Sequence, residues 1–295
     1  MGIQKPHAMM LLNEVKYRPL PKTVHLIGRQ TIYLTVDDAH RAFYEAGVTP
    51  FPCPVEIDKA TGGALNANAG YITDETFFRM LGAQDVHAID IAAKEGANII
   101  LDLNLDLPPQ YEGVADFIFG GSVCDNVFNP AGYIRNINRL LASGGRYASQ
   151  EVASNNWHPY VVLPPAWHHD YFTVNGFADV KIYVFHCSPH GWNTYLLDPP
   201  INYDFIPNFT VPKELVAGVF IIVEKGAAST WSAVPNQDQY RSAGEWMTIR
   251  ANLARIRESP RPMQRYPLPL LEHERETCPV KYVPNYTFIG RVPSR

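Results

Sequence analysis

The chain contains 295 residues, 46% of them hydrophobic and 18% charged, which is typical of a folded globular protein and excludes a largely disordered one. Its formal net charge of −4 gives no general attraction to nucleic acid or anionic membranes, and no apolar run approaches the ~20 residues of a membrane span. We therefore expect neither nucleic acid nor a membrane as partner. The four cysteines form no CxxC pair, which is typical of a reduced cytoplasmic protein.

Proline is unevenly distributed along the chain: there are 25 in total, and none in the segment 55–107. This distribution predicts a regular core between two irregular segments. We predict an N-terminal arm over 1–22, an α/β domain over 23–225 with an insertion at about 48–70, and a C-terminal extension over 226–295. The proline-rich extension is expected to pack on the core or on a partner subunit, which is compatible with a homodimer.

Short apolar runs bounded by turn residues alternate with segments of helical periodicity. This alternation predicts an α/β protein with a mostly parallel sheet. In chain order, we predict a strand at 23–27, helices from 37 to 47 and from 74 to 82, strands at 86–91, 99–103 and 115–119, a helix from 130 to 144, a strand from 146, strands at 180–185 and 218–224, and a helix at about 240–257. The strands at 180–185 and 218–224 are predicted to close the sheet as an antiparallel pair.

Acids, amides and glycines stand where several of these strands end. Asp90 ends VHAIDI, Asp102 is followed by Leu103 and Asn104 in ILDLN, and the strand 115–119 opens into Gly120-Gly121-Ser122. Ligands of parallel α/β sheets bind beyond the carboxyl ends of the strands. An acid, an acid–amide pair and two glycines at this edge favour a nucleoside ligand.

In combination, these segments resemble the class I S-adenosylmethionine-dependent methyltransferases. In that family the acid that ends the second strand binds the ribose hydroxyls, which Asp90 matches, and the end of the next strand lies beside the adenine, which Asp102-Leu103 matches. The segment ADFIFGGSVCDNVF resembles the family's fourth strand, which runs towards the methionine part of the cofactor. RNINRLLASGGRY resembles its helix and Gly-Gly turn, and NGF at 175–177 a late family element.

The resemblance implies a Rossmann-like, mostly parallel sheet flanked by helices, and S-adenosylmethionine as cofactor. One departure is that the family's GxGxG loop is absent; LIGRQ is the best substitute, although about 60 residues separate Gly28 from Asp90 where ~30 are usual. The segment from Gly62-Gly63 to Gly70 keeps the spacing better but follows no predicted strand. The candidate cofactor-binding residues are Gly28, Arg29, Gln30, Asp90, Ile91, Asp102, Leu103, Asn104, Gly120, Gly121 and Ser122.

An aromatic, histidine-rich segment at 157–177 is predicted to lie over the strand ends. Methyl transfer to oxygen gains from a general base with a near-neutral pKa, so the candidate catalytic residues are His158, His168 and His169. Trp157, Tyr160 and Trp167 are candidate walls of a substrate pocket, with core packing as the competing interpretation. The same histidines could instead supply ligands to a metal ion.

The sequence therefore predicts a methyltransferase that acts on a small molecule, with O-methyl transfer to a sugar or natural-product hydroxyl and a histidine as base. The alternative is a methyltransferase-like fold without methyl transfer. Such a chain would be a binding or scaffold protein, or a metal-dependent enzyme that uses His158, His168 and His169.

Overall fold

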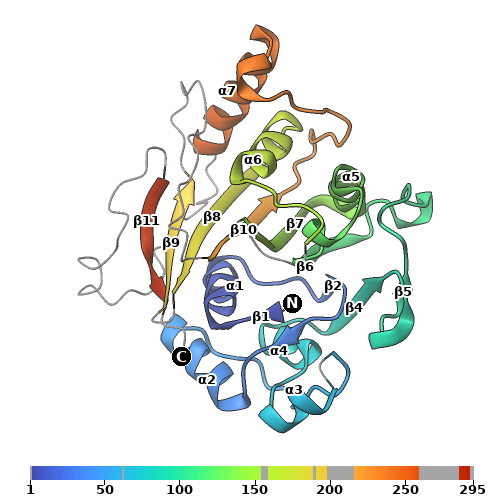
Figure 1. The fold of residues 1–295 in the computed structure, drawn as a ribbon, viewed down its shortest axis with the longest axis vertical. Helices are drawn as coiled ribbons and strands as arrows, with labels where there is room; N and C mark the ends of the chain where they lie inside the picture. Colours follow the sequence, from blue (N-terminus) through green and yellow to red (C-terminus); the bar gives the residue numbers. More distant parts are fainter. Residues whose placement is uncertain are drawn as a thin grey trace.

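The computed structural model describes residues 2–61, 63–153, 159–188, 191–197, 216–258 and 286–292. Its centre is a nine-stranded mixed sheet in the order β11-β9-β8-β10-β7-β6-β2-β4-β5, and β1 and β3 form a separate two-stranded sheet (Figure 1). The predicted Rossmann-like α/β fold, with helices on both faces of the sheet, is confirmed.

One half of the large sheet is parallel. It contains β2 (Thr23–Ile27), β4 (Asp85–Asp90), β5 (Ile99–Ile100), β6 (Ala115–Gly121) and β7 (Leu141–Val152). Because these strands run the same way, their carboxyl ends share one edge. The strand predicted at 99–103 is shorter than expected, because the Asp102 carboxylate accepts hydrogen bonds from Asn104 and turns the chain.

The other half is antiparallel and contains β8 (Asp179–Ser188), β9 (Gly191–Leu197), β10 (Val216–Glu224) and β11 (Tyr286–Val292). Strand β10 lies between β7 and β8 and is antiparallel to both, so the predicted closing pair is confirmed. Strands β9 and β11 extend the sheet beyond β8 and were not predicted.

Successive side chains of the strands point to opposite faces of the sheet, where they pack in two hydrophobic cores. Phe117 and Phe119 of β6 pack in the core on one face, and Ile118 packs in the core on the other. The first face is covered by α1 (Lys5–Tyr17), α2 (Val36–Ala46) and α4 (Asp74–Met80), and the second by α5 (Pro130–Leu140) and α6 (Pro165–Val174). The remaining elements are β1 (Gly2–Ile3), β3 (Thr31–Ile32), α3 (Gly63–Ala69), α7 (Ala243–Glu258) and the 3-10 turns η1 (Ala93–Glu95), η2 (Pro109–Tyr111), η3 (Cys124–Asn126) and η4 (Asp238–Tyr240).

Local signals fix the ends of the helices. The Thr35 side chain caps α2 and Gly47 ends it in the left-handed conformation, with φ of 66°. Thr73 caps α4, and Asn129 caps α5 with Pro130 at its first position. Helices α2 and α4 therefore begin and end close to where the sequence predicts, and α5 begins there; α5 ends at Leu140 rather than at 144, because the chain enters β7 at Leu141.

The segment predicted as an N-terminal arm forms β1 and α1. Leu11 and Leu12 of α1 are fully buried. The buried Glu14 carboxylate accepts hydrogen bonds from Arg146 of β7 at 2.9 Å and from Lys181 of β8 at 2.6 Å. Burial and this carboxylate are therefore what hold α1 against the middle of the sheet.

Candidate functional site

The ends of β2 and β4 bring Gly28 and Asp90 together. Gly28 has a φ of +69°, which favours glycine, and its N–H donates to the carbonyl of Ile89 at 2.7 Å. A Cβ built on Gly28 would lie 3.6 Å from Asp90 Oδ2, so that carboxylate faces the turn. The other oxygen, Oδ1, accepts from the Ala92 N–H at 3.3 Å. Two residues predicted as a cofactor pair are thus neighbours.

Gln30 lies across the ends of β2 and β6. Its Nε2 donates to the carbonyls of Ile27 at 3.0 Å and Gly28 at 3.3 Å, which fixes the orientation of the carboxamide. The residue is 2% exposed, and its Oε1 has no hydrogen-bond partner among the residues that the structure describes. A Cβ on Gly121 would lie only 1.8 Å from this oxygen, so glycine is required there. A buried acceptor without a donor costs free energy unless a water molecule or a ligand supplies a donor.

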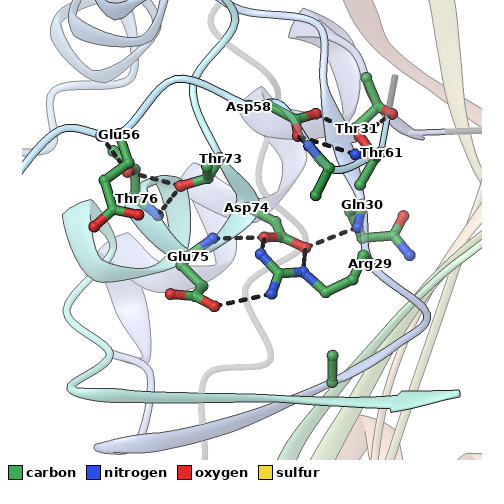
Figure 2. Close-up of polar contacts among 12 residues, drawn as sticks. Arg29, Gln30, Thr31, Glu56, Asp58, Thr61, Thr73, Asp74, Glu75 and Thr76 are labelled. Carbon is green, nitrogen blue, oxygen red and sulfur yellow. Dashed lines mark hydrogen bonds and ion pairs between the residues drawn. The ribbon is translucent and has the colours of Figure 1, made fainter. Parts of the chain in front are cut away.

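Arg29 points away from this edge, towards the start of α4. Figure 2 shows its guanidinium facing Asp74 and Glu75, with Nε 3.0 Å from Asp74 Oδ2 and Nη1 2.9 Å from Glu75 Oε1. Asp74 also accepts from the Gln30 N–H at 2.8 Å. Burial raises the pKa of the Asp74 carboxyl, while the Arg29 charge opposes that rise. The Arg29 side chain therefore shapes the loop that substitutes for the glycine-rich turn.

The buried Asp58 carboxylate binds other residues of the predicted insertion, 48–70. Asp58 accepts from the Ala60 N–H and from Asn66 Nδ2, both at 2.8 Å, and from the Thr61 hydroxyl. The Thr61 hydroxyl lies 2.7 Å from that of Thr31 on β3 (Figure 2). The second glycine candidate does not lie at a strand end, since Gly63 and Gly70 flank α3 and Gly62 lies outside the described residues.

The predicted adenine-side residues form the turn after β5. Asp102 Oδ1 accepts from the Asn104 N–H at 2.9 Å, and Asn104 Oδ1 accepts from the N–H of Asn129, the cap of α5, at 3.0 Å. Leu103 is 7% exposed and belongs to the second core, whereas Ile91 after β4 is 63% exposed. The turn after β5 thus presents the polar side chains of Asp102 and Asn104, and the exposed Ile91 side chain follows β4.

The glycines and the serine that end β6 face different neighbours. Gly120 packs towards the core, since a Cβ there would lie 2.9 Å from the Tyr133 hydroxyl, whereas Gly121 faces Gln30. Ser122 has a φ of 56°, the one positive value for a non-glycine residue in the described ranges. Its hydroxyl lies 2.8 Å from Asp125 Oδ2.

Two buried carboxyl groups, Asp125 and Glu151, lie at the ends of β6 and β7, and sequence reasoning missed that they come together. Asp125 is fully buried and accepts from the Val152 N–H at 3.1 Å, and Glu151 accepts from the Ser149 hydroxyl. Burial raises the pKa of Asp125, and burial together with the Asp125 charge raises that of Glu151 well above its usual range. The polar run Ser149-Gln150-Glu151 at the end of a predicted strand was the available signal.

The predicted catalytic histidines lie on or before α6. His158 and Trp157 lie outside the described residues. Burial lowers the pKa of His168 to about 3, and His169 Nδ1 lies 3.2 Å from Asp170 Oδ1. No group of three His, Cys, Asp or Glu side chains able to hold a metal ion occurs in the part of the chain that the structure describes.

The two described candidates for aromatic pocket walls, Trp167 and Tyr160, have different surroundings. Trp167 lines a cavity of about 380 Å³ between α5 and α6, together with Arg135, Asp170 and Arg241. Tyr160 is 72% exposed, and its ring stands edge-on to that of exposed Phe128, with ring centroids 6.1 Å apart.

A different cavity, of about 370 Å³, lies at the ends of β6 and β7. Ser122, Gln150 and Glu151 line it on the strand side, and residues of β1, α1, β8 and β9 complete its wall. It adjoins the candidate cofactor residues through Ser122, and neither His168 nor His169 is among its lining residues.

Comparison with known proteins gives structural likeness only. Neither a family model nor a curated protein matches the chain. Solved structures that resemble it include the DszA carbon methyltransferase (15% identity, TM-score 0.40, covering 77% of this chain and 54% of that one). The citrinin polyketide synthase CMeT domain has 13% identity and a TM-score of 0.40, with 75% of this chain and 52% of that one covered. A putative methyltransferase from Bacillus halodurans has 12% identity and a TM-score of 0.36, with 74% and 99% covered.

The chain thus spans about half the length of the first two structures. The DszA structure is named as a carbon methyltransferase and the Bacillus halodurans structure as a putative methyltransferase. Among the described residues, no helix has both the length and the apolar character to cross a membrane.

Proposed function

We propose that the chain is an S-adenosylmethionine-dependent methyltransferase that acts on a small molecule. The observation that carries the proposal is the convergence of Gly28, Asp90 and Gln30 at one point of the carboxyl edge. Each offers what this cofactor needs: a backbone that a ligand can approach, a carboxylate for two vicinal hydroxyls, and an unpaired amide oxygen.

The candidate residues could bind the ribose, the adenine and the methionine part of the cofactor. The Asp90 carboxylate would accept from the ribose hydroxyls, and the turn at Asp102-Leu103 would lie beside the adenine, as the family resemblance implies. Gln30 Oε1 would accept an N–H from the α-ammonium group of the methionine part, which gives the unpaired oxygen a donor. When bound, the cofactor supplies a methyl group on a sulfonium, which is a good electrophile.

The finer part of the proposal is O-methyl transfer to a sugar or natural-product hydroxyl. The net negative charge of the chain supports a small molecule over nucleic acid. A base works best with a pKa near the working pH, which His168 at about 3 does not meet. His169, whose Nδ1 lies 3.2 Å from Asp170 Oδ1, is the other candidate histidine that the structure describes, and we keep it as the proposed base.

Calorimetric titration with S-adenosylmethionine and S-adenosylhomocysteine tests the cofactor. We expect micromolar binding, about −8 kcal/mol, and a loss of at least tenfold, about 1.4 kcal/mol, in Asp90→Ala. The control is Asp116→Ala, which removes an exposed acid at the opposite end of β6 and should leave binding unchanged. Folded wild-type protein that binds neither compound at millimolar concentration would contradict the proposal.

The alternative is a binding protein with this fold and no methyl transfer. It is favoured by the missing GxGxG loop and by the use of the Arg29 side chain to bind Asp74 and Glu75. Cofactor binding that depends on Asp90, combined with no methyl transfer across a panel of hydroxyl acceptors, would support this alternative.

A further inference from the structure

The cavity at the ends of β6 and β7 is enclosed by segments far apart in the sequence. Gly2 and His7 come from the N-terminal segment, Gln150 from β7, and Phe185 and Trp192 from β8 and β9. Its volume of about 370 Å³ falls within the range of small-molecule sites, and it adjoins the candidate cofactor edge through Ser122.

Two buried side chains that line the cavity each have a polar atom without a partner. His7 is 5% exposed, and its Nδ1 accepts from the Gln4 N–H at 3.3 Å, so the neutral ring carries its proton on Nε2. Gln150 is 4% exposed, and its Nε2 donates to the Gly2 carbonyl at 2.8 Å, which leaves Oε1 as an acceptor. Neither His7 Nε2 nor Gln150 Oε1 has a hydrogen-bond partner among the described residues. The wall thus offers one unpaired donor and one unpaired acceptor.

The rest of the wall is aromatic. The rings of Phe185 and Trp192 stack with centroids 4.6 Å apart and an interplanar angle of 18°, and the His7 ring stands edge-on to both at 5.3 and 4.8 Å. Gly218 leaves room for the Phe185 ring, since a Cβ there would lie 2.2 Å from its Cζ. Such walls select an aromatic ligand by shape and by ring contacts.

The ionisable groups of the wall favour an uncharged ligand. Burial lowers the pKa of His7 to about 3 and raises that of the Cys187 thiol to about 12, so both groups are neutral near pH 7. Burial, with the Asp125 charge, raises the pKa of Glu151. A charged ligand would therefore lose its hydration here without gaining an opposite charge from His7 or Cys187.

We propose that this cavity binds an uncharged aromatic compound with a hydroxyl group, which accepts a hydrogen bond from His7 Nε2 and donates one to Gln150 Oε1. A hydroxyl can both accept and donate a hydrogen bond, which matches one unpaired donor and one unpaired acceptor. The assignment of this compound as the methyl acceptor rests on the proposed function, whereas its binding does not. His7 and Gln150 are positioning residues in this arrangement.

The test compares three probes of one shape, titrated without cofactor: 2-naphthol, 2-methoxynaphthalene and 2-naphthoate. The naphthol can accept and donate, the ether can only accept, and the naphthoate is charged. We expect 2-naphthol to bind with 1:1 stoichiometry and at least tenfold more tightly than either of the others. Equal affinity for naphthol and ether, or preference for naphthoate, would overturn the proposal.

Two variants separate the two hydrogen bonds. Gln150→Met should weaken 2-naphthol at least fivefold and leave the ether unchanged, whereas His7→Phe should weaken both. The matched control is His25→Phe, which replaces another buried histidine, on β2, outside this cavity. Circular dichroism melting checks that each variant folds. If Gln150→Met does not fold, the preference of the wild type for naphthol over the ether tests the proposal.

Cofactor titration of the same proteins keeps the two proposals apart. Naphthol selectivity without S-adenosylmethionine binding would overturn the methyltransferase proposal and the acceptor role, and keep the ligand site. S-adenosylmethionine binding without naphthol selectivity would overturn the ligand site alone.

Discussion

Between the loop after β2 and the start of α4, a buried carboxylate accepts hydrogen bonds from a guanidinium and a backbone N–H, whereas the cavity beneath α1 is lined by neutral side chains with unpaired polar atoms. In the first region the Asp74 carboxylate is satisfied by Arg29 and by the Gln30 N–H. In the second, His7 and Gln150 each keep one polar atom without a protein partner among the described residues. In the first region the hydrogen bonds therefore hold the loop in place, whereas in the second two polar atoms remain available for the proposed ligand.

Asp74→Asn should give the largest effect, because it breaks the ion pair on which the first region depends. The substitution leaves the buried Arg29 guanidinium with only the partly exposed Glu75 as an opposite charge, so we expect a loss of about 3 kcal/mol in the free energy of unfolding, measured in urea. Glu75→Gln is the control, since the Glu75 side chain is 29% exposed and a pair of that kind contributes less than about 1 kcal/mol. Equal losses in the two variants would contradict the assignment of Asp74.

Gly121→Ala tests the contact between β6 and the Gln30 side chain. The added methyl group would occupy the position of Gln30 Oε1, so the carboxamide must move, at a cost of about 2 kcal/mol typical of overpacking. We expect cofactor affinity, measured by calorimetry, to fall about tenfold with it. Gly244→Ala is the matched control, since the nearest atom to its Cβ is Ser242 Oγ at 3.8 Å, and it should be neutral.

The pH dependence of stability tests whether the buried His7 of the cavity is neutral in the folded protein. His7 is buried with a pKa of about 3, below the 6.5 of an unfolded histidine, so the unfolded chain binds the extra proton between these values. Stability contributed by neutral His7 is present above pH 6.5 and is lost as the pH falls, by up to about 1.4 kcal/mol per pH unit.

We therefore expect His7→Phe to have a shallower loss of unfolding free energy between pH 6.5 and 4.5 than the wild type. Leu12→Ala serves as the control: it deletes a buried side chain of the same helix, so it should lower stability without changing the slope. Identical slopes for His7→Phe and the wild type would show that the ring is protonated in the folded state.

The sequence was sufficient to place several of the candidate cofactor residues at one edge of the sheet. Apolar runs located β2, β4 and β6, and since parallel strands end at one edge, the residues that follow them had to meet there. Gly28, Asp90 and Gly121 are in fact grouped around Gln30. Cap residues such as Thr73 and Asn129 located the helices for the same reason: their signals are local.

The cavity could not be predicted in this way. His7 lies in a segment interpreted as an arm, and its meeting with Phe185 and Trp192 depends on how α1 docks on the sheet. Periodicity shows which face of a helix is buried but not which distant side chains it will touch. The same limit explains Arg29, whose partner Asp74 is 45 residues away.

The attachment of α1 has a consequence for the order of events during folding. Glu14 joins Arg146 across 132 residues and Lys181 across 167, so these contacts close very long loops. Closing such long loops costs conformational entropy before the contacts can stabilise the fold, so we expect these contacts to form late and slowly. The cavity depends on α1 for His7 and for part of its wall. A refolding chain would therefore complete the wall of this cavity only after the N-terminal helix docks on β7 and β8.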